Sequence, residues 1–432
     1  MTQAAEMSKA FAARATEALQ AYLRIDTTNP PGDVRPAIAF FRRLLTEAGI
    51  LHEEFASDAA SGKINLLARL RGTGKAKPIL LLNHLDVVPA EPQKWRLPPF
   101  SGALQDGEVW GRGALDMKSM GIAELMVLLR LKQEGMPLGR DVLWLGVCDE
   151  EIGGGLGARW MVEHHYDQLD PEYVLDEGGG GSRGILAGPE RIVFAPSVNE
   201  KQPIWLKLTV RGMGGHGSMP VGPGAVEILN QALGRVLAAK DELEKAEDHP
   251  IVTVMRQRLG SIPRNRYTDA ITRNTITITS LQAGVGTPPP PNVIPSEATA
   301  TIDCRLLPGV DVEGFLKRLT HCLGDPRVEV EVTYQPSEIG LTSSHDTALF
   351  RIIEEVVKAR YPQALVSPQL LTGGTDSRFF RAKGAIAYGF EPLIIAPAEM
   401  DQIHGHNERI GVAQFAEMLE ILYEVVTRLA RS

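Results

Sequence analysis

The chain has 432 residues, too many for one ordinary hydrophobic core, so its length predicts two domains. A composition that is 44% hydrophobic and 23% charged is that of an ordinary soluble globular protein. The net charge of −8 is spread along the chain and no basic stretch is interleaved with aromatic residues, which argues against nucleic acid and anionic membrane as partners.

The cysteines and the first residues indicate a reducing compartment. Cys148, Cys304 and Cys322 lie far apart and form no CxxC pair, so we expect neither a disulfide framework nor a cysteine-bound zinc finger. Residues 1–24 have helical spacing but no continuous apolar stretch, so we expect neither a secretory signal nor a membrane anchor. We therefore predict a cytoplasmic protein.

Helical and strand patterns alternate over the first two hundred residues. The predicted helices cover 37–49, 117–134 and 157–165, and the predicted strands cover 65–70, 78–83, 142–148 and 173–175. The last of these strands leads into a glycine-rich stretch that we interpret as a loop. The alternation predicts an α/β sheet with helices on its faces.

The order of predicted elements changes in the middle of the chain. It becomes strand 204–210, helix 224–245, strands 274–281 and 297–304, helix 312–322 and strand 328–334. This β-α-β-β-α-β order is that of a ferredoxin-like fold. Beyond it, a helix at 347–361, a strand at 385–390 and a helix at 412–431 return to the first pattern. We predict one α/β domain with a mixed sheet, formed by residues 1–201 and 337–432 and split by an inserted domain at 202–336.

Acidic residues follow directly on the predicted strand 142–148. Glu150 and Glu151 emerge at its carboxyl end, where open α/β sheets place ligand crevices. Adjacent carboxylates repel one another unless a cation or a proton lies between them. Such a pair suits a hydrolytic metal site, in which one carboxylate binds metal and another moves protons. A solvated acidic loop is the alternative interpretation of this pair taken alone.

Further acidic and imidazole clusters lie at predicted strand exits or loops of the same domain. His84 and Asp86 point the same way on an extended segment, so Asp86 could accept a proton from one ring nitrogen while the other binds metal. Asp116 could cap the following helix or bridge two cations with its two oxygens. The remaining candidates are Asp176, Glu177, His404, His406 and Glu408. Together the clusters favour a two-metal site over coincidental surface charge, and Zn²⁺ suits such ligands.

The chain resembles the co-catalytic zinc amidohydrolases, which include aminoacylase, carboxypeptidase S, glutamate carboxypeptidase, acetylornithine deacetylase and succinyl-diaminopimelate desuccinylase. The resemblance covers nearly the whole length and rests on NHLDVVP, GRGALDMK, DEEIGG, VLDEGG, GGHGSMP, GGTDSRFF and IHGHNE. VLDEGG is most similar to the carboxypeptidase S and N-acyl-amino-acid hydrolase branch. The resemblance implies a split catalytic domain with a di-metal site and an inserted lid and dimerisation domain.

The resemblance also implies two Zn²⁺ ions per subunit, with Co²⁺ or Mn²⁺ as alternatives. The implied ligands are two imidazoles and three carboxylates: His84, Asp116, Glu151, Glu177 and His404. Asp116 would bridge the two ions, and the peptide bond that follows it is commonly cis in this family. Asp176 is the local alternative to Glu177, and His406 is the alternative to His404.

Other residues are implied to act on the substrate. Glu150 would be the general base, Asp86 would support the histidine ligand, and His216 would reach across a dimer to stabilise the oxyanion. A turn histidine between glycines is the alternative reading of His216. The implied substrate contacts are Asn292, Arg305, Gly374 and Arg378. A guanidinium suits a free carboxylate, and glycines allow the backbone to approach the substrate closely.

We therefore predict a metal-dependent amidohydrolase that cleaves an N-acyl amino acid or small peptide beside a free carboxylate and releases an amino acid. A homodimer through the inserted domain is expected. The alternatives are a dipeptidase or carboxypeptidase acting on unblocked peptides and, more remotely, a non-catalytic metal-dependent binding protein. The arginine-rich segment 246–273 is interpreted as a solvated loop, with a substrate entrance as the alternative.

Overall fold

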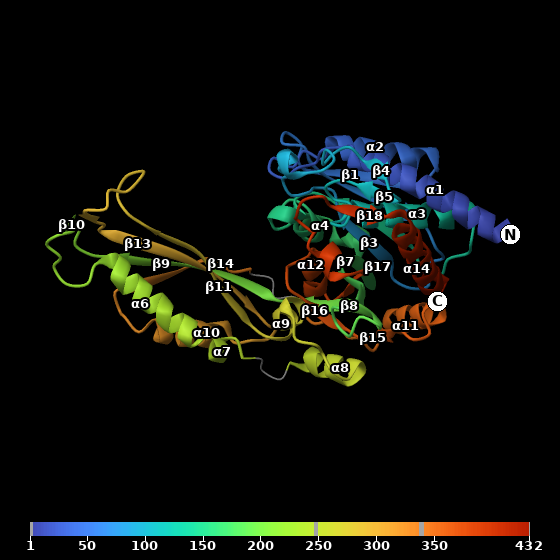
Figure 1. Cartoon of the computed structure of the whole chain (residues 1–432). Helices are drawn as coiled ribbons and strands as arrows, with labels where there is room; N and C mark the ends of the chain where they lie inside the picture. Colours follow the sequence, from blue (N-terminus) through green and yellow to red (C-terminus); the bar gives the residue numbers. More distant parts are fainter. Residues whose placement is uncertain (1–2, 246–248, 337–340, 432) are drawn as a thin grey trace.

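The computed structural model describes residues 3–245, 249–336 and 341–431. The chain forms two units (Figure 1): a large unit around a nine-stranded sheet and an elongated small unit around a four-stranded sheet. Both ends of the chain belong to the large unit. The predicted boundary between residues 336 and 337 adjoins residues outside the described ones.

The large sheet is mixed, as the sequence predicts. Its strands follow the spatial order β1-β2-β6-β3-β7-β17-β8-β15, and β16 also pairs with β8. The strands are β1 (Leu51–Asp58), β2 (Lys63–Leu70), β3 (Ile79–His84), β6 (Val142–Val147), β7 (Tyr173–Arg183), β8 (Ile192–Glu200), β15 (Leu365–Val366), β16 (Gln369–Leu371) and β17 (Ile386–Ile395). The central strands β6, β3, β7 and β17 run parallel, so their carboxyl ends meet at one edge.

Helices cover both faces of the large sheet, which explains the continuous apolar sequences of its central strands. In β3, Ile79 and Leu81 pack on one face, and Leu80 and Leu82 pack on the other. The first face carries α1 (Gln3–Leu23), α2 (Arg35–Glu47), α3 (Lys118–Glu134), α11 (Ala348–Arg360) and α14 (Val412–Arg431). The second carries α4 (Ala158–His164), α5 (Tyr166–Leu169) and α12 (Ser377–Ala382). In the described ranges, none of the helices has the length and apolar character that a membrane crossing needs.

A three-stranded sheet joins distant parts of the chain beside the large sheet. It has the order β18-β5-β4, formed by β4 (Ala103–Gln105), β5 (Glu108–Trp110) and β18 (Arg409–Gly411). Arg409 pairs with Trp110 in the antiparallel register of β18 and β5. This pairing brings the segment before Arg409 next to the segment that follows Trp110.

The small unit has the ferredoxin-like order that the sequence predicts. It runs β9 (Gln202–Arg211), α6 (Ala225–Ala238), β11 (Thr275–Ala283), β13 (Glu297–Leu306), α10 (Val312–Leu323) and β14 (Val328–Tyr334). Its strands are antiparallel in the order β11-β13-β9-β14 and share a separate hydrophobic core with α6 and α10. The predicted single helix at 224–245 is interrupted after Ala238, and a short helix α7 (Lys240–Leu243) follows. A two-stranded ribbon, β10 (Gly215–His216) with β12 (Val293–Ile294), lies at the far end (Figure 1).

The glycine-rich stretch after residue 175 is a strand and not the predicted loop. β7 continues through its four glycines and pairs with β17 and β8. A Cβ atom at Gly180 would lie 1.9 Å from the carbonyl oxygen of Glu391, and one at Gly179 would lie 2.5 Å from that of Gly389. The glycines therefore permit a close approach of backbones, which strand propensity alone does not reveal.

The arginine-rich segment is also ordered differently from the prediction. Its residues 246–248 lie outside the described ones, and the rest contains α8 (Pro250–Leu259) and α9 (Arg266–Thr272) in place of a solvated loop. Apolar residues between the arginines, among them Ile251, Met255 and Ile271, pack into the core of the large unit. These helices contact β15 and β16, although they belong to the stretch of sequence between strands of the small unit.

Candidate active site

Two imidazoles and three carboxylates converge near the carboxyl ends of β3, β6 and β7. Their possible ligand atoms form two groups, each with all atoms within 4.8 Å of one another. One group is His84, Asp116 and Glu177, and the other is Asp116, Glu151 and His404. Asp116 is common to both groups, and the peptide bond after it is cis.

The two oxygens of Asp116 face different imidazoles. Asp116 Oδ1 lies 3.1 Å from His84 Nε2, and Oδ2 lies 3.0 Å from His404 Nε2. Glu177 Oε1 lies 3.8 Å from His84 Nε2, and Glu151 Oε2 lies 3.2 Å from His404 Nε2. This donor set fits two divalent cations that share one carboxylate, with one histidine and one further carboxylate for each.

The electrostatics of the cluster favour positive charge. Burial acts to raise the pKa of Asp116, but hydrogen bonds from His404 and His84 lower it well below its usual value. Hydrogen bonds to Asp116 and Glu151 raise the pKa of His404 to about 10. Burial, reinforced by the charge of Asp116, raises the pKa of Glu177 well above its ordinary range. Carboxylates this close need protons or cations between them.

The geometry distinguishes the alternatives that the sequence left open. Asp176 turns away from the cluster, because its Oδ2 accepts hydrogen bonds from the Ser377 backbone at 2.9 Å and the Ser377 hydroxyl at 2.8 Å. His406 is 40% exposed, and its Nε2 lies 3.6 Å from Glu91. Glu177 and His404 are therefore the residues that the fold brings to Asp116.

Glu150 lies in a tight turn, η2 (Glu150–Ile152), and lines a cavity together with Glu151 and His404. The preceding residue, Asp149, has a left-handed φ of 76° and a buried ion pair of 2.8 Å with Lys63. Burial raises the pKa of Glu150 well above its usual value, and the charge of Glu177 raises it further. A carboxylate with a raised pKa and access to a cavity is a candidate general base.

The support of His84 differs from the prediction. His84 Nδ1 lies 2.9 Å from the main-chain oxygen of Asp86, whereas the Asp86 carboxylate is 3.8 Å away. That carboxylate accepts hydrogen bonds from the backbone N–H groups of Glu150 at 3.2 Å and Glu151 at 3.3 Å, and from Asn29 Nδ2 at 2.8 Å. The main-chain carbonyl of Asp86 thus orients His84. The side-chain carboxylate of Asp86 holds the η2 turn.

A buried ion pair that was not predicted from the sequence connects the segment that contains Asp116 with the segment that contains His404. Glu408 Oε2 lies 2.8 Å from Arg112 Nη1, and both side chains are almost fully buried. Glu408 Oε1 accepts hydrogen bonds from the backbone N–H groups of Leu115 at 2.7 Å and Asp116 at 3.1 Å. Arg112 also donates to the carbonyl of Gly405 at 2.8 Å. The pair lies in two motifs that carried the resemblance, GRGALDMK and IHGHNE.

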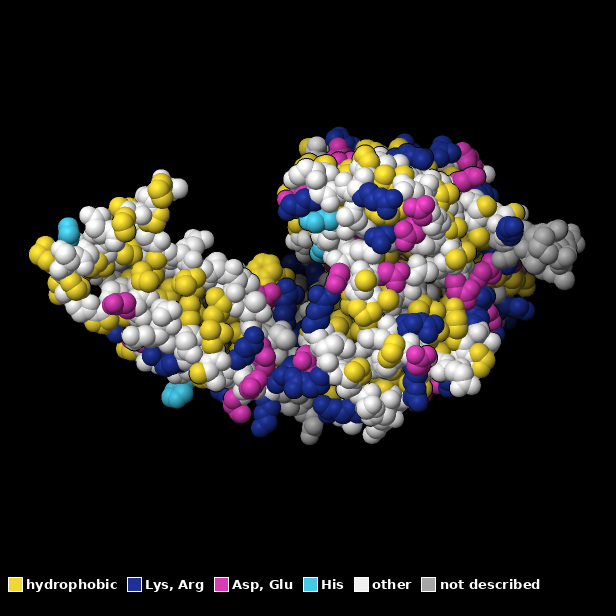
Figure 2. Space-filling model, viewed as in Figure 1, with side chains coloured by type: hydrophobic (Ala, Val, Ile, Leu, Met, Phe, Trp, Pro, Cys, Tyr) yellow, Lys and Arg dark blue, Asp and Glu magenta, His cyan; other side chains and the backbone are white. Residues whose placement is uncertain are grey.

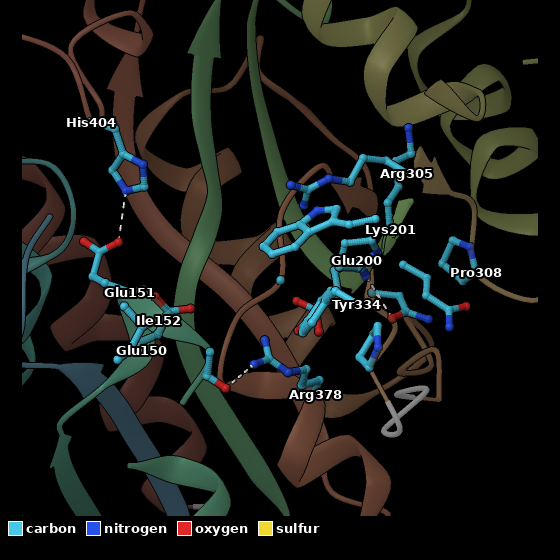
Figure 3. A pocket seen from close by; sticks show the side chains of 17 residues that line it. Glu150, Glu151, Ile152, Glu200, Lys201, Arg305, Pro308, Tyr334, Arg378 and His404 are labelled. Atoms are coloured by element: carbon cyan, nitrogen blue, oxygen red, sulfur yellow. Dashed lines mark hydrogen bonds and ion pairs between the residues drawn. The ribbon is translucent and has the colours of Figure 1, made fainter. Parts of the chain in front are cut away.

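A cavity of about 570 Å³ opens beside Glu150 at the junction of the two units. Figure 3 shows His404 and Glu151 on one side of it and Arg305, Tyr334 and Arg378 across from them. The Arg378 guanidinium is held by hydrogen bonds of 2.9 Å to the carbonyls of Thr375 and Gly153. Lys201, Trp205 and Gly374 also line this cavity. The guanidinium of Arg378 makes the cavity suitable for an anionic group of a ligand, whereas Arg305 is paired with Asp303 at 2.9 Å and burial lowers the pKa of Lys201 to about 7.

A second cavity, of about 430 Å³, meets the first at the cluster of imidazoles and carboxylates. Glu150, Glu151, Gly374 and His404 line both cavities. The walls of the second are largely apolar and include Ile185, Leu186, Leu371, Leu393, Ile395, Met400 and Ile403. The sequence does not distinguish these residues, because apolar residues in strands and helices resemble ordinary core residues.

Two predicted site residues lie far from the cluster within one chain. His216 and Asn292 are exposed near the β10–β12 ribbon, and Asn292 accepts a hydrogen bond from the Gly217 backbone at 2.7 Å. A wide recess separates this end of the small unit from the large unit (Figure 2). His216 Nδ1 accepts from the Ser218 backbone N–H at 3.2 Å, so its Nε2 is the nitrogen that can donate.

Comparison with known proteins yields one family and similar relatives. A family model described as peptidase family M20/M25/M40 matches residues 80–428. The chain is 32% identical over 381 residues to the N-fatty-acyl-amino acid synthase/hydrolase PM20D1 of Xenopus tropicalis, covering 82% of this chain and 72% of that protein. It is 30% identical over 420 residues to aminoacylase-1A of Rattus norvegicus, covering 95% and 93%. An M20 family metallo-carboxypeptidase from Sulfolobus solfataricus has the same fold, with a TM-score of 0.69 at 18% identity over 95% of this chain and 98% of that one.

Proposed function

Because the chain belongs to peptidase family M20/M25/M40, a family of metal-dependent hydrolases of N-acyl amino acids and peptides, we propose that it cleaves N-acyl amino acids with an apolar acyl group. The observation that carries the proposal is the meeting of two unlike cavities at Glu150 and the ligand cluster. The cationic cavity suits the free carboxylate of the amino acid, and the apolar cavity suits the acyl group. The scissile amide then lies between them, beside Glu150.

The proposed cofactor is a pair of divalent cations held by the two groups that share Asp116. Zn²⁺ suits a set of imidazoles and carboxylates, and Co²⁺ and Mn²⁺ suit it too. Such cations, when bound, supply Lewis-acid chemistry that polarises a carbonyl and acidifies water. Glu177 and Glu151 complete the two groups, in preference to Asp176 as a ligand.

In the proposed mechanism the side chains position the substrate and move one proton. Arg378 binds the substrate carboxylate, and the cavity that contains Arg305 and Tyr334 holds the amino-acid side chain. Glu150 takes the proton of the attacking water and returns it to the nitrogen of the leaving amine. The raised pKa of Glu150 suits this return, because the protonated carboxyl persists long enough to act as an acid.

A homodimer that forms through the small unit would supply a hydrogen-bond donor for the oxyanion of the reaction. His216 of the partner subunit would donate from Nε2 to the oxyanion, and the ribbon that carries it projects away from its own chain's site (Figure 1). Mixing a His216→Ala subunit with a Glu150→Gln subunit should restore part of the activity that each homodimer lacks. Demonstrated heterodimers without any recovery would contradict a shared site.

Hydrolysis of unblocked dipeptides is the second candidate function, and one residue favours it. Glu391 lines the apolar cavity, and its buried Oε1 has no hydrogen-bond partner among the residues that the structure describes. Such a carboxylate could bind the free ammonium of a peptide. Relative kcat/KM for N-acyl amino acids and for dipeptides of matched length separates the two functions. Turnover of unblocked dipeptides alone would overturn the acyl proposal.

The cavity assignment is tested by a pair of filling variants. Met400→Trp narrows the apolar cavity and should reduce kcat/KM for long acyl chains while turnover of an acetyl substrate persists. Ile152→Trp fills the other cavity and serves as the matched control, because it should change amino-acid preference and leave the acyl-length preference in place. If Met400→Trp lowered kcat/KM equally for substrates of every acyl length, the assignment of the apolar cavity to the acyl group would be contradicted.

A further inference from the structure

A third cavity, of about 470 Å³, lies outside the candidate active site, between the end of α8, the loop that follows it and α9. Among the residues that the structure describes, its lining includes four basic side chains and one acidic side chain, Asp269. The basic residues are Lys245, Arg256, Arg264 and Arg273. Figure 2 shows Lys and Arg side chains below the junction of the units, between α7 and α8, with Asp and Glu side chains among them. The described lining of the cavity is nevertheless mostly basic in a protein whose net charge is −8.

The positive charge in this cavity is only partly neutralised. Arg264 Nη2 lies 3.2 Å from Asp269 Oδ2, and Arg273 Nε donates to the carbonyl of Glu244 at 3.4 Å. Neither Arg256 nor Lys245 has an ion-pair partner within residues 3–245, 249–336 and 341–431. Like charges that line one cavity repel, and an anion with several oxygens would relieve that repulsion. Guanidinium groups bind phosphate and carboxylate through paired N–H donors.

Helix α9 connects this cavity with both cavities of the candidate active site. Tyr267 lines the apolar cavity, and Asp269 lines the basic one. The carbonyl of Ala270 accepts a hydrogen bond of 2.8 Å from Lys201 Nζ, and Lys201 lines the cationic substrate cavity. A ligand that fixes α9 therefore acts on a helix that touches both halves of the substrate site.

We propose that the basic cavity is a second ligand site, specific for a small anion with at least two phosphate or carboxylate groups. Its occupant changes substrate affinity through α9. Coupling between two sites is reciprocal, so a substrate that binds more tightly in the presence of the anion must tighten anion binding by the same factor. The binding part of the proposal does not depend on which acyl substrate the enzyme uses.

The test uses the full-length, metal-loaded protein and three probes: sulfate, a sugar bisphosphate and succinate, each against sodium chloride at equal ionic strength. Titration calorimetry should show saturable binding of the bisphosphate, and the comparison with succinate distinguishes a phosphate ligand from a carboxylate one. The Lys245→Gln/Arg256→Gln variant should lose at least about tenfold in affinity. The matched control is Lys317→Gln/Arg318→Gln on α10, which removes the same charge outside the cavity. That control should bind as the parent does.

Each outcome decides the proposal. Saturable binding that the cavity variant loses and the control keeps, together with a change in KM on anion addition, supports it. Absence of saturable binding, or equal binding by both double variants, overturns the site. Saturable binding with an unchanged KM overturns the coupling through α9. Activity of the cavity variant without anion should equal that of the parent, so a failed anion test is distinguishable from a wrong enzymatic function.

Discussion

The Glu408→Gln variant tests how the chain holds the segment of Asp116 beside the segment of His404. The Glu408 carboxylate receives four N–H donors, two at each oxygen: Arg112 Nη1 and the Gly113 backbone at Oε2, and the Leu115 and Asp116 backbones at Oε1. A glutamine has one acceptor oxygen, so its amide N–H₂ would face two of these donors. It would also leave the Arg112 guanidinium buried without its counter-charge.

The expected loss follows from the burial of this pair. Side-chain exposure is 2% for Arg112 and 0% for Glu408, and removing one partner of such a pair costs about 3–5 kcal/mol of unfolding free energy. The matched control is Glu108→Gln, because Glu108 pairs with Arg409 at 3.0 Å while the two side chains are 36% and 28% exposed. A pair this exposed contributes about 0–1 kcal/mol.

Urea unfolding of the metal-free proteins, followed by tryptophan fluorescence, measures both losses without a contribution from metal binding. We expect the Glu408→Gln curve to shift far more than the Glu108→Gln curve. Because Glu408 holds the Asp116 backbone, its variant should also bind metal about 10–100-fold more weakly. Equal stability losses in the two variants would refute the structural role of the buried pair.

Two further predictions concern the proton chemistry of the site. Glu150→Gln should retain its metal and lose about 10²–10⁴ in kcat, and turnover near the parent rate would exclude Glu150 as the base. His404 has its pKa raised to about 10, so it carries a proton at neutral pH in the metal-free protein, and metal binding should release that proton. The apparent affinity for metal should then rise with pH up to about that pKa. Protonated His404 also stabilises the metal-free protein, and this stabilisation should disappear as the pH rises through the pKa of His404. Calorimetry in two buffers of different ionisation enthalpy measures the release, and equal heats in both would contradict it.

The parts of the fold that the sequence predicts are those in which local pattern and burial agree. The run Ile79–His84 is apolar on both faces and forms a central strand with helices on either side. β1 was missed because Phe55 is its one buried residue and most of its exposed residues are polar. β8 was missed because Pro196 interrupts a pattern whose strand character depends on pairing with β7.

The convergence of the imidazole and carboxylate side chains could be predicted from the sequence, because only a few side-chain types can bind metal and here they follow strand exits. The structure brings His84, Asp116 and His404 together, as the motifs led us to expect. The sequence could not identify the residues that line the cavities. Leu393 and Met400 differ from core residues only because their side chains border a cavity and not other apolar side chains. The helices of the arginine-rich segment were missed for a related reason: their apolar residues meet a core that only the folded chain creates.

The most direct test of the proposal that Asp116 is shared by two metal ions is the metal content of variants of the proposed ligands. After dialysis against buffered zinc, the parent protein should hold two ions per chain, Glu177→Gln and Glu151→Gln should each hold one, and Asp116→Ala should hold neither. An Asp116→Ala protein that is folded and still binds two ions would contradict the account.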